Sequence, residues 1–101
     1  MISFEKRLRD EVACSIDDIA ASAAKKPNLA ASQFIDLVMR LLKEVGTKNS
    51  KAEILTAVGS VYDDTIAKID LPGEIDPILH ALLRQIVLVA VGIAYDRIAA
   101  E

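Results

Sequence analysis

The C-terminal quarter of the chain is nearly all apolar and reads DPILHALLRQIVLVAVGIAYDRIAA over residues 76–100. Arg84 is the only charged side chain between Pro77 and Tyr95. The Asp76-Pro77 pair is typical of a helix start, because Asp caps free backbone N–H groups and proline suits the first helical position. The β-branched centre of this stretch could by itself be a buried strand. Its flanks favour a helix and the sequence offers no second strand to pair with it, so we predict one long helix.

Two amphipathic helices are predicted in the first half of the chain. Apolar residues recur every three or four positions from Phe4 to Ala23, which predicts a helix over residues 4–24. The second helix, over residues 29–45, gives most of its circumference to apolar side chains and so contacts more than one neighbour. Gly46 follows it directly, as is typical of a helix C-terminus.

A third helix is predicted between these two and the apolar C-terminal helix. It begins at the capping box Ser50-Lys-Ala-Glu53, in which each side chain satisfies a free backbone N–H group of the other residue, and we expect it to continue to about Ile69. Four helices joined by short loops favour antiparallel neighbours. The sequence therefore predicts a single all-α domain over residues 1–101, a four-helix bundle of antiparallel up-down topology or a close variant.

The composition excludes several classes of protein. The 101 residues are 52% hydrophobic and carry a formal net charge of only -3, whereas disordered chains are poor in aliphatic residues and highly charged. Aromatic residues make up 4% of the chain, which argues against base-stacking nucleic-acid modules. The single cysteine, Cys14, excludes an intramolecular disulfide, and no Cys/His cluster predicts a metal site. We expect no nucleic-acid partner and no cofactor.

The N-terminal residues lack the apolar core of a signal peptide, since Glu5 and Lys6 interrupt them. The longest uninterrupted apolar run, Ile86–Tyr95, is ten residues long, about half of the roughly 20 residues that a transmembrane helix requires. We therefore expect a cytoplasmic protein without a membrane span.

The predicted C-terminal helix is apolar all round, and a helix of this kind must be covered on all sides. One of its faces consists of Leu82, Ile86, Val89 and Ile93. A broadly opposite face consists of Val87, Leu88, Val91 and Tyr95. Three partner helices leave part of the circumference uncovered, so the second face either lies in the core of the fold or contacts another molecule. We predict that Val87, Leu88, Val91 and Tyr95 form the interface of a homodimer.

No set of side chains predicts catalysis. His80, the only histidine, follows Asp76 by four positions, but we assign Asp76 to the helix cap and expect His80 at the surface or in an interface. The paired acidic residues are adjacent in sequence and so point about 100° apart on a helix, which does not bring catalytic carboxylates together. We expect Cys14 to be a small, buried or half-buried hydrophobic residue.

These observations favour a non-enzymatic helical-bundle protein. We expect it to self-associate through its C-terminal helix and to bind another protein, as an adaptor, an assembly factor or an inhibitor. The alternative is a helical bundle whose aliphatic interior binds an acyl chain or another small apolar ligand.

Overall fold

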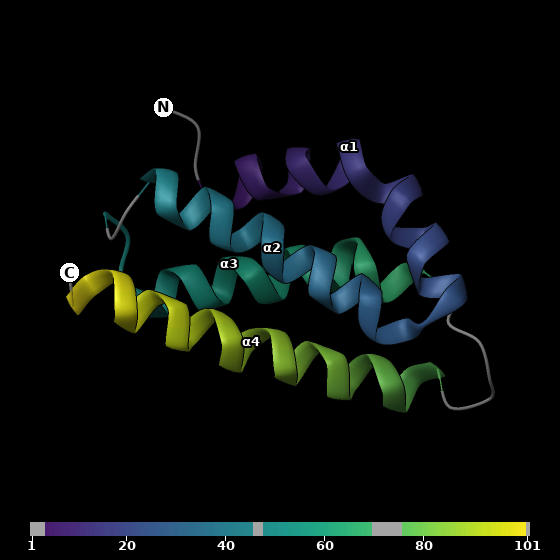
Figure 1. The fold of residues 1–101 in the computed structure, drawn as a ribbon. Helices are drawn as coiled ribbons and strands as arrows, with labels where there is room; N and C mark the ends of the chain where they lie inside the picture. The colour runs from purple at the N-terminus through teal and green to yellow at the C-terminus, as the bar shows by residue number, and fades with distance from the viewer. Residues whose placement is uncertain (1–3, 46–47, 70–75, 101) are drawn as a thin grey trace.

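The computed structural model describes residues 4–45, 48–69 and 76–100, which form a bundle of four α-helices (Figure 1). The elements in chain order are α1 (Phe4–Lys25), α2 (Pro27–Val45), α3 (Lys51–Asp64), the short 3-10 helix η1 (Ile66–Lys68) and α4 (Asp76–Ala100). The prediction of an all-α helical bundle with a long C-terminal helix is confirmed. The predicted cap at Gly46 and the capping side chain of Asp76 lie outside the described residues.

The start of α3 follows the sequence prediction, whereas its end does not. Ser50 Oγ accepts a hydrogen bond from the Glu53 N–H group, and Glu53 Oε1 accepts one from the Ser50 N–H group, both at 3.2 Å, which confirms the capping box. The helix ends at Asp64, several residues before the predicted end. At this point the Thr65 hydroxyl donates to the Val61 carbonyl oxygen at 2.6 Å. Such a side-chain bond competes with the regular helix, and the chain continues as η1.

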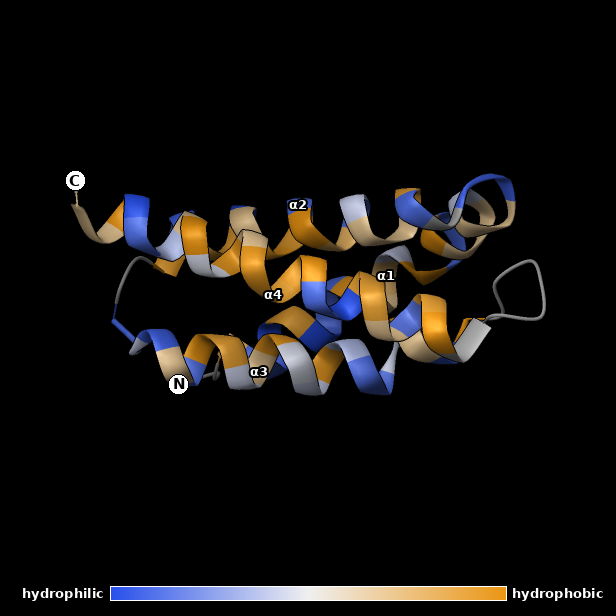
Figure 2. Ribbon diagram, turned by 90° about the horizontal axis from the view of Figure 1, so that it is seen from below, coloured by the Kyte–Doolittle hydropathy of each residue, from blue (hydrophilic) through white to orange (hydrophobic). Residues whose placement is uncertain are grey.

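Successive helices run in opposite directions, as the colour sequence in Figure 1 shows. In space, however, α4 packs against α2 and α3, and α1 packs against the same two helices from the other side. The order around the bundle is therefore α1, α2, α4, α3, with α1 and α4 diagonally opposed. Figure 2 shows α4 in front, between α2 and α3, with α1 behind. This position leaves one side of α4 uncovered within a single chain.

The core lies between the four helices and is mostly aliphatic, with two aromatic rings at its centre. Phe34 of α2 and Tyr62 of α3 are almost fully buried and pack edge to face, with ring centroids 5.7 Å apart. Edge-to-face packing is a favourable geometry for aromatic pairs. From α1 the core receives Phe4, Leu8, Val12, Ile19 and Ala23, and from α4 it receives Leu83, Val87, Val91 and Ala94.

Candidate interaction surface on helix α4

One face of α4 is apolar and open to solvent. Its five large aliphatic side chains are spaced four, four, three and four residues apart, so they form one stripe along the helix. The exposed fraction of the side chains falls from 64% at Ile78 to 51% at Ile93. In Figure 2 the ribbon of α4 has mostly the colours of hydrophobic residues. We call this stripe the α4 ridge; it consists of Ile78, Leu82, Ile86, Val89 and Ile93.

The four residues predicted to form the interface lie on the other side of α4. Val87 and Val91 are completely buried in the core of the single chain. Leu88 and Tyr95 are partly buried and pack against the same core. The assignment of the two faces was therefore wrong, because the face that contains Leu82, Ile86, Val89 and Ile93 is the open one.

Polar contacts at both ends of α3 accompany this orientation of α4. Arg84 Nε donates to Asp63 Oδ1 at 2.9 Å, and the Tyr95 hydroxyl donates to the Asn49 carbonyl oxygen at 2.6 Å. Gly59 makes room for the first of these contacts, since a Cβ atom at this position would lie only 2.6 Å from Arg84 Nη2. Turning α4 about its axis to expose Val87 would break both contacts. These partners are 21 and 46 residues away in the sequence, which is why helical periodicity could not identify them.

His80 is a further polar anchor on the core side of α4. It is 8% exposed, and its Nε2 atom lies 2.8 Å from the Ile69 carbonyl oxygen. Because a carbonyl oxygen only accepts hydrogen bonds, Nε2 carries the proton, and Nδ1 can accept from the Tyr62 hydroxyl at 3.1 Å. The expectation of a surface or interface histidine was wrong. Its burial near Leu83 and Val87 follows from the helical spacing of three and four residues.

Two shallow grooves flank the C-terminal half of the α4 ridge. The first, of about 260 Å³, lies between α2 and α4 and is bounded by Met39, Lys43 and Ile93. The second, of about 320 Å³, lies between α3 and α4 and is bounded by Leu55, Gly92 and Ile93. We call them the α2-side groove and the α3-side groove. Ile78 is thus the most exposed residue of the ridge, while the surface is hollow on both sides of Ile93.

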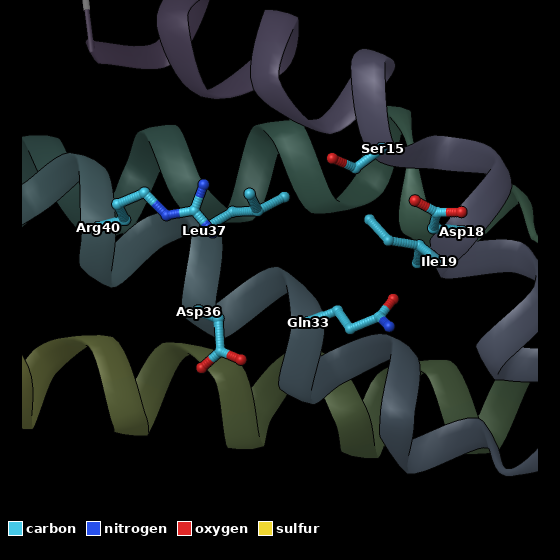
Figure 3. A pocket seen from close by; sticks show the side chains of 7 residues that line it. All are labelled: Ser15, Asp18, Ile19, Gln33, Asp36, Leu37 and Arg40. Atoms are coloured by element: carbon cyan, nitrogen blue, oxygen red, sulfur yellow. The ribbon is translucent and has the colours of Figure 1, made fainter.

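A different, polar depression of about 190 Å³ lies between α1 and α2 (Figure 3). The carboxylates of Asp18 and Asp36 come from different helices and do not point toward one another. Gln33 Nε2 donates to Ser22 Oγ at 2.8 Å. Gln33 Oε1 is buried and has no hydrogen-bond partner in the described part of the chain. This depression is a surface of mixed charge and contrasts with the apolar α4 ridge. Its lining residues are Ser15, Asp18, Ile19, Gln33, Asp36, Leu37 and Arg40.

Cys14 is exposed on α1, so the expectation of a buried or half-buried cysteine was wrong. It follows the buried Val12 by two positions, about 200° around the helix, and so falls on the outer side of α1. Within residues 4–45, 48–69 and 76–100, no three His, Cys, Asp or Glu side chains are close enough to share a metal ion.

α4 is also the one helix in the described ranges that is long and apolar enough to cross a bilayer, judged by length and composition. This segment, Ile78–Ala100, contains an 18-residue window with a mean hydropathy of 1.9 and extends well beyond the uninterrupted apolar run Ile86–Tyr95. Within its apolar window, 33% of the residues are buried in the bundle. Length and hydropathy are weak criteria, because core helices of soluble proteins also meet them.

We compared the chain with protein-family models, with curated proteins and with solved structures, and none of these comparisons gives a match. Its function therefore has to be inferred from its own residues and their geometry.

Proposed function

We propose that this protein is a non-enzymatic helical-bundle interaction protein that self-associates through the α4 ridge. The observation that supports this proposal is the ridge itself: five Ile, Leu or Val side chains in one stripe, each more than half exposed. Scattered apolar residues are ordinary at a protein surface, but a contiguous apolar patch is typical of interaction sites. The ridge replaces the predicted interface residues, while the predicted helix is retained.

The free energy available from burying the ridge is sufficient for a weak dimer. Full burial of one such side chain contributes about 1.5–3 kcal/mol, so covering the exposed half of five side chains contributes about 4–8 kcal/mol per protomer. Two protomers contribute about 12 kcal/mol at the middle of this range, against an association cost of at least about 4 kcal/mol. The difference is therefore at most about 8 kcal/mol, which corresponds to a Kd of about 1 μM at the tightest.

The length of the ridge is also compatible with a dimer. The ridge extends from Ile78 to Ile93, about 22 Å along α4, on a molecule that measures 41 Å by 23 Å by 18 Å. A standard-sized interface buries about 800 Å² per partner, so the partner would also contact the edges of α2 and α3. The ridge would occupy the centre of this interface, and the edges of α2 and α3 would form its rim.

The test is the molar mass of the purified protein between about 1 and 100 μM, measured by light scattering and sedimentation velocity. We expect a concentration-dependent shift from the chain mass of 10.9 kDa toward twice that value. A monomer at every concentration would overturn the proposal. If such a monomer floats with phospholipid vesicles, the ridge binds a membrane surface. If it retains an apolar molecule in native mass spectrometry, the bundle binds a small apolar ligand.

A further inference from the structure

We propose that the second copy docks on the α4 ridge in an antiparallel orientation, with Ile78 of each protomer inserted into the α3-side groove of the other. This inference rests on the proposed self-association. It adds the orientation of the partner, the register of the two helices and the side chain that fills the groove.

The spacing of the ridge fits an antiparallel pair. Ile78 and Ile93 are equally far from a point between Gln85 and Ile86, and so are Leu82 and Val89. A two-fold axis at this point, perpendicular to α4, therefore places Ile78 opposite Ile93 and Leu82 opposite Val89 of the partner. Ile86 lies next to the axis and meets its own copy. All five ridge residues then have an apolar partner, as a closed two-fold interface requires.

The shape of the ridge distinguishes this orientation from a parallel one. Ile78, at the N-terminal end of the ridge, is its most exposed residue, and the C-terminal half is hollow on both sides of Ile93. In an antiparallel pair Ile78 of each protomer meets the hollow half of the other. In a parallel pair Ile78 would meet Ile78, and grooves of about 260 and 320 Å³ would face each other. Unfilled space of this kind forfeits packing contacts.

The α3-side groove offers an aliphatic wall to Ile78 of the partner. Leu55, Leu88 and Val89 supply this wall, while Lys51, Gln85 and Asp96 line the polar part of the groove. The Lys51 side chain lies beside Gly92, since a Cβ atom at Gly92 would be 3.4 Å from Lys51 Cε. Positions 78, 85 and 92 are seven residues apart, nearly two helical turns, so Ile78 and the groove lie on the same α3-facing edge of the ridge. The two-fold axis therefore brings Ile78 of one protomer to the α3-side groove of the other. Helix pairing of this kind also places opposite ends of the two helix dipoles together.

Cross-linking between single cysteines tests the orientation. In a Cys14→Ser background, Ile78→Cys and Ile93→Cys proteins are prepared separately, one with a size tag, and treated with a short bis-maleimide alone and after mixing. We expect cross-linked dimers predominantly in the mixture. Residues 78 and 93 are about 22 Å apart along α4, so a parallel dimer would instead link each variant to itself. That result would overturn the antiparallel orientation and leave the proposed self-association intact.

A distance measurement checks the same geometry away from the contacts. Spin labels on Arg97→Cys, also in the Cys14→Ser background, lie 11.5 residues from the axis, which gives a separation of about 35 Å in the antiparallel dimer. A parallel dimer, with helix axes about 8–10 Å apart, would give less than about 20 Å and would overturn the inference. A monomeric mass for the wild-type chain is a separate result, because it would overturn the self-association itself.

Discussion

Replacing Ile86 by glutamate introduces a negative charge at the centre of the α4 ridge. Ile86 is 56% exposed in the single chain, so the substitution removes little of the monomer's own core packing. Glutamate is also a slightly better helix former than isoleucine. We therefore expect the isolated protomer to keep its fold, while the dimer loses an apolar contact next to its two-fold axis.

The expected loss of dimer affinity can be worked out from these positions. Two isoleucine side chains no longer bury their exposed halves, which costs about 2–3 kcal/mol. Two carboxylates are desolvated side by side, which adds at least about 2 kcal/mol. A total of about 4–6 kcal/mol raises the Kd by three to four orders of magnitude, from near 1 μM to 1 mM or above. The variant should therefore be a monomer at any practical concentration.

Sedimentation velocity and light scattering from about 1 to 100 μM are the assay, with circular dichroism as the check on folding. The control is Ala13→Glu, which adds the same charge at an exposed position of α1, diagonally opposite α4. The control should dimerise like the wild type. If Ile86→Glu keeps the mass and the dilution behaviour of a wild-type dimer, the α4 ridge is not the interface. If Ala13→Glu dissociates equally, net charge rather than the ridge governs association.

Three further substitutions test the fold. Val87→Ala removes two methyl groups from a fully buried site. We expect the free energy of unfolding to fall by about 2–3 kcal/mol and Tm to fall by roughly 10–20 °C, while the protein remains a dimer at concentrations above the Kd. A change in Tm of less than about 2 °C would contradict the burial of Val87. Tyr62→Phe removes the hydroxyl that contacts His80, and we expect the free energy of unfolding, measured with denaturant, to fall by about 1–3 kcal/mol. An unchanged midpoint of unfolding would refute a stabilising role for this hydrogen bond. Ser50→Ala removes half of the capping box with Glu53 and should lower Tm by about 4–8 °C; Ser50→Asp, which retains a capping oxygen, is the matched control and should stay near the wild type.

Much of the fold could be predicted from local patterns. The period of apolar residues located α1 to within one residue of Phe4–Lys25, and the capping box located the start of α3. These signals depend on residues three or four positions apart, so the sequence contains them directly. The end of α3 was predicted less well, because the backbone of Thr65 leaves the helical conformation, with φ -125° and ψ -74°, before the apolar pattern stops.

The environments of His80 and Cys14 show the limit of this reasoning. His80 was expected at the surface or in an interface because no catalytic partner was found for it, but Tyr62 and the Ile69 carbonyl supply hydrogen-bond partners that make its burial possible. Cys14 was placed inside because its neighbours are small, although it lies off the apolar stripe of α1. In both cases the residue type gave a wrong prediction of burial. The position of each residue relative to the core determines whether it is buried.

The sequence by itself determined that α4 is a helix, that it is apolar all round, and that a bundle of this size leaves part of it uncovered. It could not determine which face is uncovered, because both faces are aliphatic and helical periodicity does not distinguish them. Only the tertiary structure decided this. In the folded chain Val87 and Val91 pack in the core, Arg84 contacts Asp63, Tyr95 contacts Asn49, and the α4 ridge faces outward. Rotation about a helix axis depends on distant partners, and their positions exist only in the folded chain.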